Sequence, residues 1–280
     1  MPVYKPYASL GAIDKLESKN GHSPMMMYHP SLKALHPQQD PSGTLAKLRT
    51  IKLFQQFEDA ALLSIAAKCY ESHFDKETAI FYESDLPSET GRKVYFVLEG
   101  CVKLVKYSSD GESTIVRLAS KGEFFGVTGA ITNQPLPFSA LAFMDTNLLT
   151  LDIENFRKVV FEYPNLALDM VVALGEVLWF NYETHNQVVK RTDARVSKII
   201  LYHLMRDGYE ETPAGQQLNI LLPHNYIASM TGIAYEESVR IVSRLRKQYD
   251  CIQYLRGGKI IITNLKQLKE LAQGDDLWGV

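Results

Sequence analysis

The chain has 280 residues, of which 46% are hydrophobic, and its formal charge at pH 7 is −2. This length suits about two domains with cores of their own, and the nearly neutral charge excludes a protein that binds polyanions through its overall charge. No apolar run reaches the roughly 18 residues that a membrane-spanning helix needs, and the N-terminus shows no charged-then-apolar signal pattern. We therefore expect a cytoplasmic protein with no membrane partner.

Cysteine spacing and catalytic motifs narrow the function further. Cys69, Cys101 and Cys251 are far apart and show no C-x-x-C spacing, so neither a zinc site nor a disulfide framework is predicted. The sequence has no G-x-S-x-G, no phosphate-binding glycine loop and no metal-spaced set of His, Cys and Asp. These patterns argue against an enzyme and against a bound metal or cofactor.

The first 45 residues contain many prolines and little periodic apolar pattern, which predicts an extended or weakly ordered arm. Three histidines at seven-residue intervals raise the alternative of a haem or metal site in this arm. Prolines close to them would break any helix that aligned the three, so we do not favour that alternative. The prolines are Pro2, Pro6, Pro24, Pro30, Pro37 and Pro41, and the histidines are His22, His29 and His36.

The next segment, residues 46–163, combines a helical pattern with many strand-like runs. A helix is predicted from Phe57 to Phe74, opened by two acidic residues. From Thr78 to about Leu151, short alternating apolar runs are separated by Gly, Asp, Asn and Pro, which is typical of the strands of a β-roll. Turns are expected at Gly100 and at residues 109–111.

A long helix is predicted from Asn165 to about Val189, within residues 164–192. Its apolar residues recur at alternating three- and four-residue steps, which is the a/d pattern of a coiled-coil seam. This pattern favours a homodimer, and the alternative is an amphipathic helix that packs only on its own strands. The seam residues are Leu168, Val171, Gly175, Leu178, Tyr182, His185 and Val189.

Residues 222–262 have the pattern of a helix-turn-helix followed by a β-hairpin wing. Ile227, Ala228 and Met230 indicate a short amphipathic helix, and Gly232 provides a residue that can take positive φ in the turn. A second helix is predicted from about Ala234 to Gln248. Its inward-facing residues are predicted to be Val239, Ile241, Val242 and Leu245, and the wing turn is Arg256-Gly257-Gly258-Lys259.

The second helix is the candidate DNA-recognition helix. Arginine pairs with guanine and glutamate accepts from cytosine in the major groove, and Glu236 and Arg240 are four residues apart. The alternative is an ordinary surface salt bridge, but from Arg240 to Lys269 eight basic residues stand against the single acidic Asp250. The predicted base contacts are Tyr235, Glu236, Glu237 and Arg240, and the predicted phosphate contacts are His224, Asn225, Ser243, Arg244, Arg256 and Lys259.

Two segments resemble the CRP/FNR family of bacterial transcription regulators: KVYFVLEGCVKLVKYSSDGESTIVRLASKGEFFG, at residues 93–126, and the helix-turn-helix PHNYIASMTGIAYEESVRIVSRLRKQ. The likeness spans roughly residues 50–272. It implies an α+β fold with an N-terminal double-stranded β-helix (the β-roll of cyclic-nucleotide-binding domains), a long dimerisation helix and a C-terminal winged helix-turn-helix. It also implies a homodimer that binds a palindromic operator in double-stranded DNA, with RNA polymerase as a further partner. The expected segments are an arm at 1–45, an effector domain at 46–163, a dimerisation helix at 164–192 and a DNA-binding domain at 193–280.

The chain departs from the family pattern in the recognition helix. Tyr235 stands where the family has an arginine, Glu237 where it has a threonine or serine, and Ala234 where it has a small hydroxyl residue as N-cap. These differences predict an altered base preference. In the β-roll, Glu77 replaces the glycine of a family turn, and Ser84-Asp85 replaces a Gly-Asp turn.

The effector pocket departs further. In relatives that bind cyclic AMP, a glutamate after the second β-roll glycine receives the ribose and an Arg-Ser pair holds the phosphate; here Val127, Thr128 and Phe138 stand in place of the glutamate and arginine. Without that arginine, tight binding of a cyclic nucleotide is not expected, although Arg117 is a possible substitute. The alternatives are a small apolar effector or haem, or a β-roll interaction protein whose helix-turn-helix is only structural. The possible pocket residues are Val127, Thr128, Phe138, Ser139, Asn181 and Tyr182.

Overall fold

A computed structural model describes residues 41–83, 85, 92–108, 111, 113–132, 134–185 and 191–273, without the side chains of 41, 42 and 179–185. The predicted arm therefore lies outside the described residues up to residue 40, together with His22, His29 and His36. Its last residues are helical rather than extended, because α1 (Pro41–Leu48) begins there. Within the described ranges, no helix has the length and apolar character needed to cross a membrane.

The predicted β-roll is present, and it is built from two four-stranded antiparallel sheets. In β3 (Lys93–Glu99), Val94 and Phe96 face a core shared with the helices, while Tyr95 and Val97 face the space between the sheets. Both faces of this strand are buried, which explains its nearly continuous apolar sequence. One sheet has the order β1 (Cys69–Phe74), β8 (Thr146–Asp152), β3, β6 (Phe124–Phe125), and the other β2 (Ala79–Phe81), β7 (Ser139–Ala142), β4 (Cys101–Tyr107), β5 (Ser113–Ser120).

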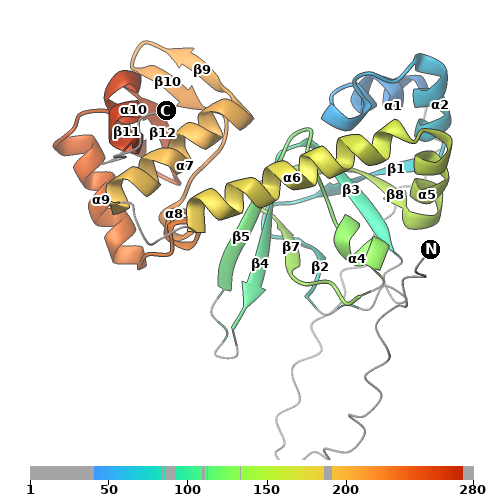
Figure 1. Ribbon diagram of the computed structural model, residues 1–280, viewed down its shortest axis with the longest axis horizontal. Helices are drawn as coiled ribbons and strands as arrows, with labels where there is room; N and C mark the ends of the chain where they lie inside the picture. The colour runs from blue at the N-terminus through green and yellow to red at the C-terminus, as the bar shows by residue number, and fades with distance from the viewer. Residues whose placement is uncertain are drawn as a thin grey trace, which may run out of the picture. The chain divides into compact units, whose positions relative to one another are not determined.

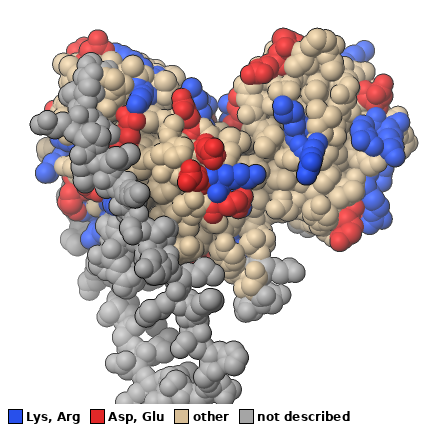
Figure 2. All heavy atoms as spheres, turned by 180° about the vertical axis from the view of Figure 1, so that it is seen from behind, with Lys and Arg blue, Asp and Glu red and all other residues tan. Residues whose placement is uncertain are grey.

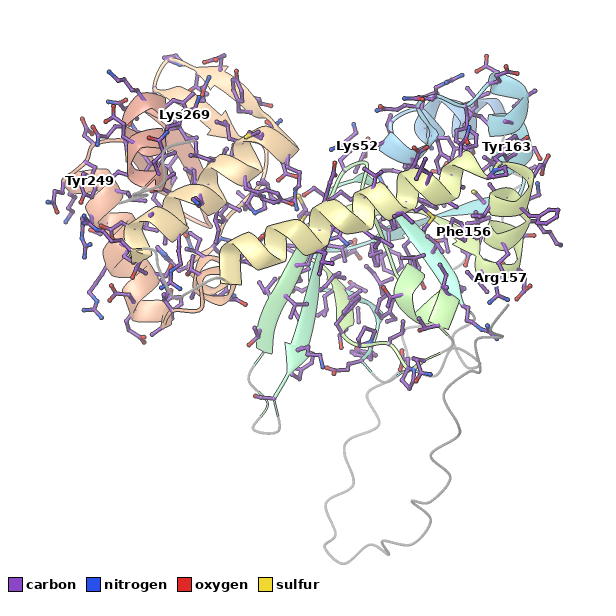
Figure 3. The ribbon with its side chains drawn as sticks, in the orientation of Figure 1. Lys52, Phe156, Arg157, Tyr163, Tyr249 and Lys269 are labelled. Carbon is purple, nitrogen blue, oxygen red and sulfur yellow. The ribbon has the colours of Figure 1, made fainter. Side chains whose placement is uncertain are left out.

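Helices cover one side of the β-roll. Figure 1 shows α1, α2 and α5 gathered at the same end of the sheets, and Figure 3 labels Phe156 and Tyr163 at that end. Phe156 is buried in the shared core, and Tyr163 packs against Phe57 with ring centroids 5.3 Å apart. The helices of this part are α1, the 3-10 helix η1 (Lys52–Phe54), α2 (Asp59–Ala66), α4 (Val127–Thr132) and α5 (Ile153–Glu162).

The predicted helix from Phe57 to Phe74 is wrong in its second half. Helix α2 ends at Ala66, and Cys69–Phe74 forms β1, which pairs along its whole length with β8. The pairing satisfies the backbone of β1 and buries Phe74 between the sheets. Tertiary pairing therefore outweighs the local helical pattern.

Two turns show how the β-roll keeps its shape despite an altered residue. Gly100 has φ +84°, and a Cβ on it would lie 2.4 Å from the carbonyl oxygen of Asp145, so only glycine fits. Glu77 also adopts a positive φ, of 65°, although it is not glycine. Its N–H donates to the carbonyl of Ala142 at 2.7 Å, and its carboxylate pairs with Lys103. The strained turn is thus retained by its contacts.

Helix α6 (Asn165–His185) follows α5, and a winged helix-turn-helix completes the described chain. The sheet of the winged helix-turn-helix has the order β11-β12-β10-β9. The buried side chains of Ile199, Ile200, Ile241, Leu245 and Ile260 belong to one apolar cluster. The elements are α7 (Thr192–Asp207), β9 (Tyr209–Thr212), β10 (Gly215–Leu218), α8 (His224–Thr231), α9 (Tyr235–Lys247), β11 (Ile252–Leu255), β12 (Lys259–Ile262) and α10 (Leu265–Gln273).

A buried polar network joins α7 to α8. Nδ1 of His203 lies 2.6 Å from Asp207 Oδ2, and its Nε2 lies 2.8 Å from the hydroxyl of Tyr226. Burial lowers the pKa of His203, so the neutral ring donates from Nδ1 to the carboxylate and accepts from the tyrosine. Arg206 Nη2 lies 3.0 Å from Asp207 Oδ2. Each group in this network has a partner, which is what permits its burial.

Candidate nucleic-acid interface

The helix-turn-helix has the predicted elements. Helix α8 ends at Gly232, which takes a left-handed conformation with φ 63° and ψ 40°. Ala234 is the N-cap residue of α9 and makes no side-chain capping bond. The turn is instead closed by backbone and hydroxyl bonds: the N–H of Ile233 donates to Ala228 O at 3.0 Å, and the hydroxyl of Thr231 donates to Ile227 O at 2.6 Å.

Helix α9 has one buried face and one exposed face. Ile241, Val242 and Leu245 are buried as predicted, but Val239 is 38% exposed, and the buried residue of that turn is Ser238. Positions 238, 241, 242 and 245 follow a spacing of three and four residues, which leaves position 239 beside the stripe. The prediction for Val239 was therefore wrong.

The exposed face begins at the first residue of α9. Tyr235 is 53% exposed, and Glu236 and Arg240 are also exposed. Arg240 pairs with Glu237 rather than with Glu236, with Nη2 and Oε2 2.7 Å apart. An exposed pair three residues apart contributes at most a few tenths of a kcal/mol, about 0.2–0.5. The pair therefore holds Arg240 only weakly, so Arg240 can leave Glu237 and bond to a DNA base instead.

Arg244 has a different environment from the other predicted phosphate contacts. Its Nη1 donates to both carboxylate oxygens of Asp193, at 2.7 and 2.9 Å. These hydrogen bonds and the negative charge of Asp193 raise the pKa of Arg244. Nearby, Arg195 Nη1 donates to Thr231 O at 2.6 Å, at the end of α8. The first turn of α7 thus ties both helices of the motif together, while a phosphate contact by Arg244 stays a prediction.

The wing is a hairpin whose glycines are required by its geometry. Gly257 and Gly258 have φ of +83° and +93°, and a Cβ on Gly258 would lie 2.6 Å from the nitrogen of Pro223. The N–H of Leu222 donates to Gly258 O at 2.7 Å, so the wing turn lies against the chain that leads into α8. Arg256 is exposed and Lys259 is half-buried on either side of the turn. Ser243 is likewise half-buried.

An aromatic cluster, which we define as His224, Tyr235 and Tyr254, connects three elements of the interface. The ring of His224, the first residue of α8, stacks on Tyr254 of β11 with centroids 4.4 Å and planes 29° apart. It meets Tyr235 edge-on, with centroids 5.9 Å and planes 80° apart. Its Nδ1 lies 3.3 Å from Ser238 Oγ, and burial lowers its pKa. The roles of Tyr254 and Ser238 were not predicted.

Basic side chains gather at the right-hand edge of Figure 2, on the part of the chain that carries the winged helix. Figure 3 labels Tyr249, just after α9, and Lys269, on α10. Asn225, beside His224, is exposed, and its Oδ1 accepts the N–H of Tyr226 at 2.9 Å. The predicted DNA-contacting residues thus lie on α8, α9 and the wing, which are neighbours in this fold.

The interior of the β-roll is filled with aromatic rings near the predicted effector pocket. Tyr95 and Phe125 stack with centroids 5.0 Å apart, and Phe81 lies 6.0 Å from Phe125 and 6.2 Å from Phe138. The buried hydroxyl oxygen of Ser139 accepts the N–H of Glu83 at 2.8 Å. The hydroxyl oxygen of Ser139, one of the predicted pocket residues, is therefore bonded within the protein.

The other predicted pocket residues stay a prediction. Val127 is buried and Thr128 is exposed, while the side chains of Asn181 and Tyr182 lie outside the described residues. Arg117, the possible substitute cation, pairs with Glu123 at 3.2 Å. Within the described part of the chain, no group of three or more His, Cys, Asp or Glu is arranged to hold a metal ion.

Helix α6 exposes the first half of its predicted seam. Leu168 and Val171 are each 64% exposed, Leu178 is exposed as well, and a Cβ on Gly175 would meet nothing within 4 Å. The side chains of Tyr182 and His185, and all of Val189, lie outside the described residues. Cys101 and Cys251 are buried free thiols, and burial raises the pKa of the Cys101 thiol to about 12. Neither of these thiols has the low pKa of a reactive cysteine.

Comparison with known families matches residues 71–163 to the cyclic nucleotide-binding domain and residues 194–271 to the Crp-like helix-turn-helix domain. A global nitrogen regulator from Synechocystis is 29% identical over 177 residues, which cover 62% of this chain and 76% of that protein. A cyclic AMP receptor protein from Thermus thermophilus is 26% identical over 196 residues, which cover 70% and 84%. These relatives are transcription regulators and not enzymes.

Solved structures agree with the fold. FixK2 from Bradyrhizobium japonicum superposes with a TM-score of 0.59 at 21% identity, over 72% of this chain and 96% of that one. A mutant of CooA from Carboxydothermus hydrogenoformans gives 0.58 at 19% identity, over 80% and 95%. The predicted α+β fold with a β-roll, a long helix and a winged helix-turn-helix is confirmed. With these two domains in this order, the chain belongs to the CRP/FNR family of DNA-binding transcription regulators.

Proposed function

We propose that the chain is a homodimeric regulator that reads a palindromic operator through α9 and needs no cyclic nucleotide in its β-roll. The observation that carries the proposal is the exposed face of α9, where Tyr235, Glu236 and Arg240 stand beside the basic wing. Arginine and glutamate at the start of a major-groove helix distinguish guanine and cytosine. RNA polymerase is the further partner that we propose for such a regulator.

The phosphate contacts that we propose surround this face. His224 and Asn225 begin α8, whose N-terminus favours negative charge, and Arg256 and Lys259 flank the wing turn. Ser243 and Arg244 lie further along α9. Because Arg244 is engaged with Asp193, its main contribution is to hold α9 in place.

Dimerisation through α6 is supported by its unpartnered apolar face. Leu168 and Val171 are too exposed to stabilise the single chain, and burial against a second α6 would remove both from water. We expect Leu168→Glu with Val171→Glu to give a monomer in sedimentation while the fold persists. Phe161→Glu, at a residue that is 90% exposed on α5, is the matched control and should leave the dimer intact.

Independence from cyclic nucleotides is supported by the aromatic filling of the β-roll and by the engaged Ser139. Added cyclic AMP should change the DNA affinity by less than about 2-fold, which is within the scatter of independent effects. A requirement for cyclic AMP would contradict this part of the proposal. The dimer and the DNA contacts would remain.

The decisive experiment selects duplexes from a random DNA library with purified, ligand-free protein at fixed, near-physiological salt. We expect a two-fold symmetric site with half-sites about 34–36 Å apart, or one helical turn. Salt-dependent binding to duplex DNA without any sequence preference would reduce the motif to a non-specific binder. No affinity for DNA at any salt would favour the β-roll interaction protein with a structural helix-turn-helix.

A second candidate is regulation by a small apolar effector, and a cavity favours it. This cavity has a volume of about 1110 Å³ and runs beside α6. Most of its lining surface is apolar, with Val172, Leu201 and Met205 among the apolar side chains, although charged side chains line it as well. Lys52 and Lys269, labelled in Figure 3, also line it. If the library selection succeeds only after cell extract is added, this candidate replaces effector independence. The haem alternative depends on histidines outside the described residues.

A further inference from the structure

We propose that His224 is a positioning residue for DNA recognition: it holds the ring of Tyr235 at the start of α9 and thereby sets the base preference of that ring. The inference rests on the proposed function. It adds to the predicted phosphate contact of His224 a second role, which acts through another residue. The contacts of the aromatic cluster carry the argument.

Tyr235 has little support of its own. It is the first residue of α9, it is 53% exposed, and the N-cap before it makes no side-chain bond. Its ring contact within the described residues is with His224, edge-on at 5.9 Å. An exposed ring with two free torsions samples several rotamers, so one neighbouring ring decides which of them dominates.

His224 is held much more firmly than Tyr235. One face of its ring stacks on Tyr254, and its Nδ1 lies within hydrogen-bond distance of the fully buried Ser238. Tyr254 is fixed in turn, because its hydroxyl donates to Leu222 O at 3.2 Å. Tyr254 in the wing strand thus fixes the ring of His224, and His224 in turn restricts the exposed ring of Tyr235.

The chemistry favours positioning over charge for this histidine. Burial lowers the pKa of His224, so the ring is neutral near pH 7 and stacks as an aromatic group. The groups that face it are Tyr254 from β11 and Tyr235 and Ser238 from α9, and none of these side chains is an acid that would hold a proton on it. A neutral aromatic ring at this point is suited to orienting a second ring.

The test measures the affinity of the full chain for its selected duplex and for every single-base variant of one half-site. Tyr235→Ala should lose about 5-fold or more in preference at one base pair, the lower end of what a base contact contributes. His224→Ala should lose preference at the same base pair. The double variant should lose no more than the larger single loss, because both changes remove one interaction.

Two further variants separate positioning from its alternatives. His224→Phe keeps the aromatic ring and should restore the base preference to within about 2-fold of the unmodified chain. Asn225→Ala, next along α8, should weaken binding equally on all sequences, as a phosphate contact does. Thermal unfolding of each variant shows whether the domain remains folded.

Three results would overturn the inference while the proposed function stands. The first is an equal loss on every sequence for His224→Ala, as for Asn225→Ala. The second is a double variant whose loss equals the sum of the His224→Ala and Tyr235→Ala losses. The third is a His224→Phe variant that loses the base preference as His224→Ala does. A flat base profile for the unmodified chain would instead contradict the proposed function, and the positioning role with it.

Discussion

The β-roll interior and the recognition face of α9 differ in where their altered side chains lie. Both regions keep the fold of the solved structures, and a residue with positive φ stands in a turn of each, Glu77 in the β-roll and Gly232 before α9. In the β-roll, aromatic rings occupy the interior and Ser139 is bonded to the chain itself. On α9 the side chains that differ from the family, such as Tyr235, point outward. A shared fold therefore guarantees neither a shared ligand nor a shared operator, and each surface must be judged by its own side chains.

The packing of the β-roll interior gives the largest expected effect of a single substitution. Phe125→Ala should lower the free energy of unfolding by about 3–5 kcal/mol, because it removes a buried ring that stacks on Tyr95. Chemical denaturation measures this change. Phe161→Ala, at an exposed ring, should change it by less than about 0.5 kcal/mol. A loss below about 1 kcal/mol for Phe125→Ala would mean a loosely packed interior with room for an effector.

Acid should destabilise the winged helix through its buried network. Burial acts to raise the pKa of Asp207, but the hydrogen bond from His203 and the charge of Arg206 outweigh it and lower that pKa to about 2. Because the folded pKa is below the unfolded value, this stabilisation is present above about pH 4 and is lost as the pH falls toward 2. The effect is on the order of 2 kcal/mol.

His203 acts in the same direction at a higher pH. Burial lowers its pKa, so its contribution is complete above about pH 6.5 and is lost as the pH falls below that value. The midpoint of thermal unfolding, measured from pH 7 to pH 2, should therefore fall throughout. In Asp207→Asn, the midpoint of thermal unfolding should fall less steeply with pH below pH 4. An unchanged slope in this variant would assign the acid sensitivity to other carboxylates.

On the exposed face of α9, the residue to test for base discrimination is Arg240. Arg240→Ala should lose about 1–3 kcal/mol of discrimination at one base pair in each half-site, as expected for a bidentate contact with guanine. Arg240→Lys keeps the charge without the planar fork, so it should retain affinity for non-specific DNA and lose the discrimination. Equal weakening on all sequences would identify Arg240 as a phosphate contact.

The smallest expected effect is at the wing. Lys259→Ala should weaken binding to every sequence alike and reduce the slope of log affinity against log salt by about 0.9 for each wing that contacts DNA. Lys121→Ala removes the same charge from an exposed position on the β-roll and should leave the slope unchanged. A change of base preference in Lys259→Ala would contradict a pure phosphate contact.

Local pattern predicted the parts of the fold in which neighbours in sequence decide the structure. The positive φ of Gly232, the buried Ile241 and Leu245 and the wing glycines were all predicted. Contacts between distant segments were not. Arg244 was predicted as a phosphate contact, but its pairing with Asp193, which stands 51 residues earlier, was not predicted. No periodicity encodes such a pairing.

The same limit applies to β1 and to the aromatic cluster. The segment Cys69–Phe74 has a helical pattern, but a complementary partner in β8 makes it a strand. His224 was predicted as a phosphate contact, whereas its contact with Tyr254 of the wing depends on how the hairpin folds back. The candidate DNA contacts were thus predicted one by one, and the connections among them required the structure.

The contacts of α9 with α7 and α8 divide its residues into those that hold the scaffold and those that can be replaced. Arg244 is bound to Asp193, and Ser238 is enclosed beside His224, so exchanges at these two positions disturb the scaffold. Tyr235, Glu236 and Arg240 have no such constraint from burial. A library randomised at these three positions alone would therefore offer evolution, or an engineer, a route to new operators on an unchanged frame.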